Sequence, residues 1–334
     1  MDYVKLGNSG VKVSQLCLGT MMFGGATDES ESIRIIHRAL DEGINFVDTA
    51  NVYNAGESER VTGKALKGRR DQVVLATKVY GPMGEGPNDQ STSRYHIMNE
   101  VENSLRRLDT DCIDLYILHK PDNTVPMEES LRALDDLVRQ GKVRYIGCSN
   151  FYAHQVCRGL WLSDKQNLES FVAVQPLYNI VNRDPEVELF PTCQEHGLGV
   201  MVYSPLARGV LAGKYLPGKE APPDSRAGRG DQRIRNTELR DESLEVAQQI
   251  KPLAERHGKT MTQFSLNWVV ANPIVTAAIV GPRTMEHLED NLGCLGWNIE
   301  EDALDEIDRM VPPGEHTGWG FNDPMYPVTG RPRS

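Results

Sequence analysis

Four polar side chains in the first third of the sequence combine a carboxylate, a phenol, an ammonium and an imidazole: Asp48, Tyr53, Lys78 and His119. Each lies at, or shortly after, the end of a short apolar run that is typical of a β-strand. The carboxyl ends of parallel strands in a barrel meet at one mouth, even when they are far apart in the sequence. We therefore expect the four side chains to converge. The apolar runs cover residues 45–47, 73–77 and 113–118.

Together these groups would form a proton donor for a carbonyl oxygen. Tyrosine is a weak acid near neutral pH, because its ordinary pKa is about 10. The ammonium of Lys78 would lower the pKa of Tyr53, and Asp48 would hold and neutralise that ammonium. His119 would orient the carbonyl by donating a hydrogen bond as a neutral imidazole. Tyr53 would then protonate the oxygen as a hydride reaches the carbon, and general acid catalysis of this kind is worth roughly 10²–10⁴-fold in rate.

The elements that must position these residues alternate between strands and helices along the chain. Continuous apolar strands joined by helical crossovers indicate a parallel sheet that is covered on its outside. The expected strands cover residues 16–20, 45–48, 73–78, 112–118, 143–148, 171–175, 199–203 and 276–280. The expected helices begin near Glu29, where Asp28 and Glu31 resemble a capping box, and continue at 57–67, 92–107, 128–140, 153–162, 185–196 and 240–271, the last split at Gly258.

Eight such units predict an α/β fold of the (β/α)8 TIM-barrel type, with an N-terminal β-hairpin and extra C-terminal helices. A doubly wound open sheet is the alternative. It would favour a G-x-G-x-x-G turn after the first strand, and the segment at 19–25 does not have this pattern. We expect one domain over residues 1–334, with the hairpin at 3–14, the barrel at about 15–295, and a helix and tail at 296–334.

Two stretches interrupt the alternation. Residues 217–238 are rich in Pro, Gly, Arg and Asp, and are typical of a long surface loop or lid. The four arginines of this loop could bind cofactor phosphates, select an acidic substrate or simply face solvent: Arg226, Arg229, Arg233 and Arg235. The tail from Pro312 contains Trp319 and Tyr326 without a helical period, and could fold over the barrel mouth.

Composition excludes several classes of function. Of the 334 residues, 39% are hydrophobic and 25% are charged, which is enough for a full core. The net charge of −11 repels phosphate backbones and argues against a nucleic-acid partner. The N-terminus lacks an apolar signal core and no run of about 18 apolar residues occurs, so we expect a cytoplasmic protein without membrane insertion. No C-x-x-C pair occurs among the six cysteines, and we expect no metal.

Three motifs resemble those of the aldo-keto reductase family, in its branch with potassium-channel β subunits and bacterial long-loop enzymes. Residues 45–53, followed by 56–59 and 63–66, resemble the first signature of that family. Residues 76–78 resemble its lysine strand, and 104–108 with 114–119 resemble its second signature. The likeness runs from the hairpin to about Asn291. It implies that Tyr53 is the general acid, Lys78 and Asp48 its tuning pair, and His119 the orienting group.

The resemblance also implies a nicotinamide dinucleotide bound across the barrel mouth. Ser149, Asn150 and Gln175 resemble the group that binds the carboxamide, and Tyr203 the aromatic residue on which the nicotinamide stacks. Residues 204–214 resemble the pyrophosphate loop, and 281–284 with 287–291 the segment for the adenosine phosphate. The full set of expected cofactor residues is Gly19, Thr20, Asp48, Ser149, Asn150, Gln175, Tyr203, Ser204, Pro205, Leu206, Arg208, Gly209, Lys214, Val280, Gly281, Arg283, His287, Asp290 and Asn291.

NADP(H) is the preferred cofactor, because Arg283 at a helix start could hold a 2′-phosphate. Pro282 and His287 depart from the usual residues of the family, which leaves NAD(H) open. The substrate would be a small carbonyl compound or alcohol. Candidate pocket residues in the loops after the strands are Phe23, Tyr53, Tyr80, His119, Lys120 and Tyr152, with Met83 and Tyr178 beside them.

Two other functions compete with this reading. An NADPH-binding regulatory subunit of a membrane channel would keep the same site residues with little turnover. A metal-dependent barrel hydrolase would need a larger cluster of His, Asp and Glu than Asp48 and His119 provide. The sequence does not determine the physiological substrate, the direction of the reaction or the oligomeric state.

Overall fold

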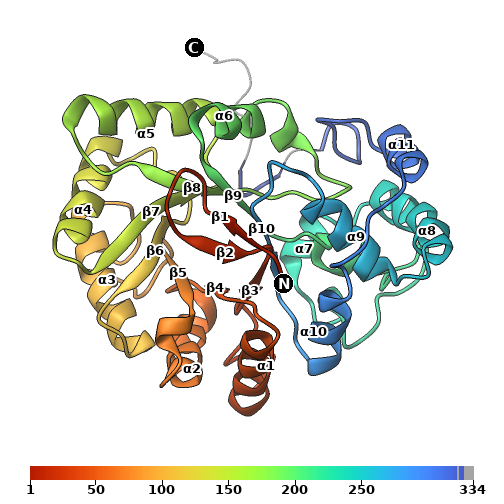
Figure 1. The fold of residues 1–334 in the computed structure, drawn as a ribbon, viewed down its shortest axis with the longest axis horizontal. Coiled ribbons are helices and arrows are strands. Elements are labelled where there is room, and N and C mark those ends of the chain that lie inside the picture. The colour runs from red at the N-terminus through yellow and green to blue at the C-terminus, as the bar shows by residue number, and fades with distance from the viewer. Residues whose placement is uncertain (322, 327–334) are drawn as a thin grey trace. The chain divides into compact units, whose positions relative to one another are not determined.

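A closed barrel of parallel strands forms the centre of the fold. Within residues 1–321 and 323–326, the part of the chain that this computed structural model describes, eight strands pair in chain order and β10 pairs with β3 to close the ring (Figure 1). The (β/α)8 prediction is confirmed, and each predicted strand is correct to within one residue at either end. The strands are β3 (Leu16–Gly19), β4 (Phe46–Asp48), β5 (Val74–Val79), β6 (Ile113–Leu118), β7 (Val143–Ser149), β8 (Phe171–Gln175), β9 (Gly199–Val202) and β10 (Ala277–Val280).

A hairpin closes the end of the barrel at which the strands begin. It consists of β1 (Tyr3–Lys5) and β2 (Lys12–Ser14), which are antiparallel, and Figure 1 looks onto it. Its apolar side chains Leu6 and Val13 are fully buried in the same cluster as Cys17 and Phe46 of the barrel strands. A side chain at position 7 would clash with the backbone of Gly199, and φ there is +57°, so only glycine fits.

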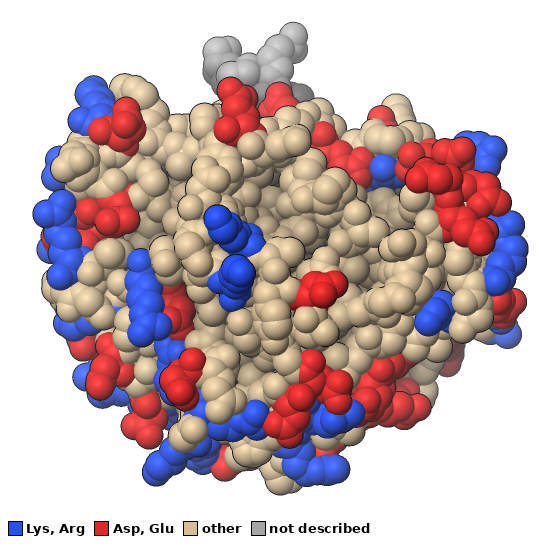
Figure 2. Space-filling model, viewed as in Figure 1, with Lys and Arg blue, Asp and Glu red and all other residues tan. Residues whose placement is uncertain are grey.

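Helices that follow six of the barrel strands cover the outside of the barrel. In Figure 1, α1 to α6 form an arc around the strands, and charged side chains of both signs mix toward the edge of the face seen in Figure 2. Asp28 accepts a hydrogen bond from the backbone of Glu31 and so caps α1. The helices are α1 (Glu29–Asp41), α2 (Glu57–Leu66), α3 (Arg94–Leu108), α4 (Met127–Arg139), α5 (Ala153–Gln166), α6 (Leu189–His196), α7 (Gln232–Asn236), α8 (Asp241–Arg256), α9 (Met261–Val270), α10 (Met285–Leu292) and α11 (Glu301–Met310).

Three predicted segments differ from the structure. The helix predicted at 153–162 continues to Gln166. The helix predicted at 185–196 starts only at Leu189, and a separate 3₁₀ turn, Asp184–Glu186, precedes it. Arg183, which precedes this turn, donates to the carboxylate of Glu186 and holds it in place. The stretch at 217–238 is not all loop, because it contains α7, which Asp231 caps through the backbone of Arg233 and Ile234.

The described chain divides into two compact units. The first comprises residues 1–176, 188–203 and 273–289 and contains the barrel, and the second comprises 177–187, 204–272 and 290–334. One domain over the whole chain therefore stays a prediction. In the second unit the tail packs beside Arg240, which donates to Thr317, while Thr317 donates through its backbone to Val181. The rest of the predicted tail, at 322 and 327–334, lies outside the described residues.

No helix in residues 1–321 or 323–326 is long and apolar enough to cross a membrane. The cytoplasmic location stays a prediction.

Buried charges tie α2 and α3 to the strand that carries Lys78. Arg107 of α3 donates to the carboxylate of Glu59 at 2.6 Å and to that of Glu100 at 3.2 Å, and both carboxylates are buried. Glu59 also accepts a hydrogen bond from Thr77, the neighbour of Lys78 in β5. Burial opposes ionisation of Glu100 and Arg107, yet their partners outweigh it, so the pKa of Glu100 is lowered and that of Arg107 is raised.

Replacing Arg107 by Met should destabilise the fold by about 3–5 kcal/mol, because it leaves two buried carboxylates without their cation. Urea unfolding followed by circular dichroism would measure this loss. The matched control is Arg60→Met, since Arg60 forms an exposed pair with Glu57 that is worth about 0–1 kcal/mol. An equal effect of the two substitutions would contradict the structural role of this network.

Candidate active site

The ammonium of Lys78 is the centre of the site. It lies at the end of β5, has no exposed surface, and donates to Asp48 Oδ1 at 2.5 Å and to the carbonyl oxygen of Thr49 at 2.7 Å. Its third hydrogen bond goes to the hydroxyl oxygen of Tyr53 at 3.2 Å. All three donor positions of the ammonium are therefore used, and two of its partners come from β4 and the residue that follows it.

The charges of this pair follow from its burial and its partners. Burial alone would lower the pKa of Lys78, but the charges of Asp48 and Tyr53 outweigh it and the pKa is raised. The pKa of Asp48 is raised, because the effect of burial exceeds the opposing effects of Lys78 and Gln175. We take Lys78 as protonated at neutral pH, because three oxygen atoms surround its ammonium.

Tyr53 is held by a strained turn between β4 and α2. Asn54 and Ala55, which follow it, adopt left-handed backbone angles, a conformation that costs roughly 1–3 kcal/mol for each such residue. Asn54 offsets part of this cost, because its side-chain amide donates to the carbonyl oxygens of Met21 and Phe23. The phenol is thereby fixed over Lys78, whose Nζ lies 4.8 Å from the centre of the tyrosine ring.

His119 completes the group. It follows β6, its backbone N–H donates to Val79, and its ring stands at 81° to that of Tyr53, with 5.8 Å between the ring centres. Burial, and then the charges of Lys78 and Lys120, lower the pKa of His119 to about 3. The imidazole is therefore neutral at physiological pH and carries one N–H. The structure thus brings together all four residues with which the sequence analysis began.

A chain of hydrogen bonds extends from Asp48 around the ends of the next strands. Gln175 of β8 donates to Asp48 Oδ2 at 2.9 Å, and Ser149 of β7 donates to the backbone oxygen of Gln175. Asn150 donates to the backbone oxygen of His119, and the hydroxyl of Tyr203 donates to Asn150 Oδ1 at 2.8 Å. These side chains together offer both donors and acceptors, which is the set that a carboxamide requires.

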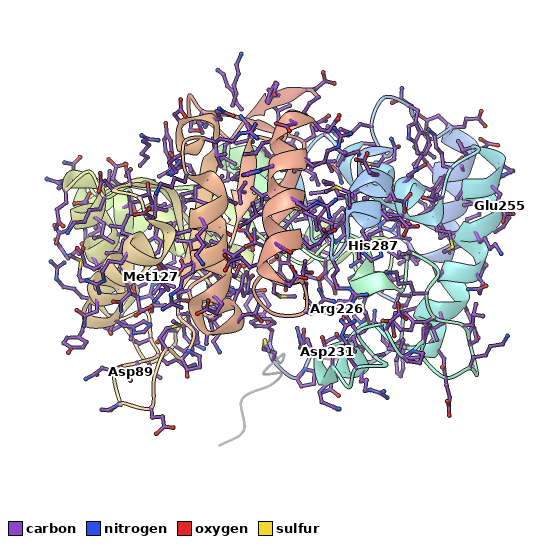
Figure 3. All side chains as sticks on the ribbon, turned by 90° about the horizontal axis from the view of Figure 1, so that it is seen from below. Asp89, Met127, Arg226, Asp231, Glu255 and His287 are labelled. Atoms are coloured by element: carbon purple, nitrogen blue, oxygen red, sulfur yellow. The ribbon has the colours of Figure 1, made fainter. Side chains whose placement is uncertain are left out.

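Other predicted cofactor residues of the first unit lie at the ends of β3 and β10. Gly19 is the last residue of β3, Thr20 donates through its backbone to Asp48, and Val280 ends β10, followed by Gly281. Arg283 precedes α10, the helix on which His287 is labelled in Figure 3. The first backbone N–H of α10 donates to a carboxylate of α1, that of Glu31.

The predicted pyrophosphate loop belongs to the second unit. Ser204, Ala207 and Arg208 have positive φ, and so does Gly209, which produces a tight succession of turns. Such turns can direct backbone N–H groups to one point and so bind anions. Arg208 is paired with the buried carboxylate of Glu238. The remaining residues predicted there are Pro205, Leu206 and Lys214.

Several predicted residues have structural partners within the second unit. Asp290 accepts hydrogen bonds from Thr260 and Gln263 at the start of α9, and Asn291 is buried one residue further along the chain. Arg233 pairs with Asp323. Arg226 lies 3.9 Å from Asp231, and both residues are labelled in Figure 3. Burial, and next the charge of Arg208, lower the pKa of Arg226. The two remaining arginines of the predicted lid donate to backbone oxygens, Arg229 to Asp224 and Arg235 to Ala227.

The candidate pocket residues fall into different environments. Tyr80 and Lys120 contact each other, with the ammonium 4.3 Å from the ring centre. Tyr152 is 48% exposed and stacks on His154, whereas Phe23 is fully buried. Tyr178 belongs to the core of the second unit, where it stacks on Trp268. Met83 lies in the loop after β5, whose projecting part carries Asp89 (Figure 3).

Sequence reasoning missed two contributions to the site. One is the backbone oxygen of Thr49, which no sequence pattern reveals. The other is the buried set of Glu59, Glu100 and Arg107, for which a signal existed: Glu59 falls on the buried face of α2 together with Val61 and Ala65. A carboxylate among buried positions of a helix indicates a buried cation opposite it.

Comparison with known proteins decides the family. The model of the Aldo/keto reductase family matches residues 15–312. The chain belongs to this family. The predicted resemblance is therefore confirmed, and the match covers Asp48, Tyr53, Lys78 and His119.

Curated relatives of this aldo/keto reductase match it over nearly their whole length. The protein named uncharacterized oxidoreductase YrpG of Bacillus subtilis (strain 168) is 39% identical over 95% of this chain and 98% of the relative. A probable voltage-gated potassium channel subunit beta of Oryza sativa subsp. japonica is 36% identical over 93% of this chain and 97% of the relative. Aldo-keto reductase YhdN of Bacillus subtilis (strain 168) is 34% identical over 98% of this chain and 97% of the relative.

Membership of the family supports an oxidoreductase that acts on carbonyl compounds, and aldo/keto reductases use nicotinamide cofactors. In the described ranges 1–321 and 323–326, no three His, Cys, Asp or Glu side chains lie together in a way that could hold a metal ion.

The neutral state of His119 predicts a specific pH dependence of stability. Its pKa is about 3 in the folded protein and about 6.5 when unfolded, so the unfolded state binds more protons between these values. This contribution is complete above about pH 6.5 and is lost as the pH falls, with a slope of at most about 1.4 kcal/mol per pH unit. His119→Gln should therefore lose stability less steeply than the parent protein between pH 6.5 and 4.5.

Urea unfolding at several pH values would test this dependence. The control is His196→Gln, because His196 is an exposed residue at the end of α6. Parallel stability curves for the parent protein and His119→Gln would show that His119 is not buried in its neutral form.

Proposed function

We propose that this aldo/keto reductase interconverts small aldehydes or ketones and their alcohols, with Tyr53 as general acid and NADP(H) as the preferred cofactor. The single observation that carries the proposal is the hydrogen bond from the buried Lys78 ammonium to the hydroxyl oxygen of Tyr53, at 3.2 Å. The ammonium donates in this bond, so the proton of Tyr53 remains available for a substrate oxygen.

Lys78 has two effects on Tyr53. Its positive charge favours the phenolate that forms once the proton has left, which makes the phenol a stronger acid. Asp48 and Thr49 keep the ammonium in position, so little reorganisation is needed during the reaction. In the oxidative direction the same groups stabilise Tyr53 as a base.

His119 orients the carbonyl. Its neutral ring can donate one hydrogen bond to the substrate oxygen, beside the hydroxyl of Tyr53. A charged imidazole would compete with Tyr53 as the proton donor. The low pKa of His119 supports a division of roles in which His119 binds and Tyr53 transfers the proton.

The donor set around the site fits a nicotinamide cofactor, which when bound supplies the hydride. Ser149, Asn150 and Gln175 would bind its carboxamide, and Tyr203, fixed by its hydrogen bond to Asn150, would stack on the ring. In the second unit, the backbone of 204–209 and the side chains of Arg208 and Lys214 would bind phosphate oxygens. The remaining residues of the predicted set are proposed as cofactor residues from the family resemblance.

Regulation of a membrane channel remains the second candidate. Relatives in Oryza sativa and Arabidopsis thaliana are named probable voltage-gated potassium channel subunit beta. Turnover separates the two functions: a regulatory subunit would bind NADPH but reduce simple aldehydes poorly.

Tyr53→Phe should lower kcat/KM for 4-nitrobenzaldehyde at least 100-fold, because it removes the proton donor. NADPH binding, measured by quenching of protein fluorescence, should stay within about threefold of the parent value. The control is Tyr95→Phe, an exposed tyrosine of α3 whose substitution should leave both quantities unchanged. A Tyr53→Phe variant with more than half of the parent activity would refute the assignment of the general acid.

Arg283→Ala should raise KM for NADPH about tenfold or more and change KM for NADH less than threefold, because only NADPH carries a 2′-phosphate for the guanidinium to bind. Steady-state kinetics with each cofactor would measure the ratio. Arg60→Ala, in α2, serves as the control for a change of net charge. If KM for NADPH and KM for NADH rise equally, Arg283 does not bind the 2′-phosphate.

A further inference from the structure

A second ammonium lies near the catalytic group, that of Lys120. It directly follows His119, and its Nζ lies 4.3 Å from the ring centre of Tyr80. Tyr80 in turn follows β5, two residues after Lys78. The ends of β5 and β6, which are neighbouring strands, thus hold both the catalytic residues and this cation–π pair.

This ammonium has no anionic partner. Among residues 1–321 and 323–326, the side chain of Lys120 forms no ion pair and no hydrogen bond; its charge lies over the Tyr80 ring and also acts on His119, which is no anion. The nearest carboxylate in sequence, Asp122, is occupied, because it accepts hydrogen bonds from Ser91, Thr92 and Thr124.

The surroundings make this unpaired charge unusual. Lys120 is half-buried, and the chain as a whole carries a net charge of −11, which would repel an anionic substrate. The other buried ammonium at the end of β5, that of Lys78, is compensated by Asp48. A partly buried cation at a site for small molecules, with an aromatic ring that limits its motion, is suited to bind an anion from outside the chain.

We propose that Lys120 selects carbonyl substrates that carry a negatively charged group, a carboxylate or a phosphate, and that Tyr80 positions its ammonium. The proposal rests on the proposed reductase function and adds the substrate class. Lys120 is a specificity residue in this scheme, since it contacts the substrate away from the carbonyl. A neutral carbonyl compound would leave the ammonium of Lys120 without a partner, so this residue would not increase the affinity for such a substrate.

Three matched aldehydes test the proposal: 4-carboxybenzaldehyde, its neutral methyl ester, and 4-formylphenyl phosphate. We expect the parent protein to give a higher kcat/KM for at least one of the anions than for the ester. The ratio of anion to ester should fall with added NaCl, because salt screens the attraction. The anion with the larger ratio identifies the charged group as carboxylate or phosphate.

In Lys120→Met this ratio should fall about 10- to 100-fold, mainly through a higher KM for the anion, and Lys120→Arg should retain most of it. The control is Lys165→Met: Lys165 lies 4.6 Å over the Trp161 ring on α5, so it forms the same kind of contact outside the site, and its loss should leave the ratio unchanged. Fluorescence titration with NADPH would verify that each variant is folded.

Two results would overturn the proposal. A parent protein that reduces the ester as well as both anions, or an unchanged ratio in Lys120→Met, would show that Lys120 does not bind substrate charge. Failure of the parent protein to reduce any of the three aldehydes would instead refute the reductase function, and this inference with it.

Discussion

The burial of one ammonium determines how the rest of the site is built. An amine that has lost all contact with water is charged only if nearby oxygen atoms replace its hydration. For Lys78 these are a carboxylate, a backbone carbonyl and a phenol, which use its three hydrogen atoms. Two of these partners balance the charge and hold it still, so the third, Tyr53, experiences a fixed positive charge. In the proposed mechanism, the acidity of the phenol would therefore result from the same contacts that make the lysine tolerable in the core.

The surrounding structure maintains that arrangement at some cost. Two left-handed residues after Tyr53 strain the turn, and the side chain of Asn54 holds it in place. Behind the strand, Arg107 and its two carboxylates join α2 and α3 to Thr77, next to the lysine. Buried ion pairs seldom add much net stability, but they penalise misplacement severely. The main effect of this network is therefore to fix the position of β5. Its net contribution to stability is small.

Sequence reasoning recovered the barrel because its signals are local and repeated: apolar runs, helical periods and caps recur in every unit. It also predicted that Asp48, Lys78 and His119 come together, because polar residues that end apolar strands stand out. It could not foresee contacts that depend on backbone atoms, such as Thr49, or on the meeting of two helices, such as Glu59 with Arg107. The short α7 inside the segment at 217–238 was missed, because five residues are too few to show a helical period.

The N-terminal hairpin buries Leu6 and Val13 against the barrel strands. It concentrates packing at the end of the barrel where the strands begin, whereas the proposed chemistry would use the other end, with its strand ends and the loops that follow them. Changes in those loops can thus alter which molecules are accepted without weakening the scaffold below. A fold with this separation can evolve new substrate selectivity quickly, because selectivity and stability depend on different residues.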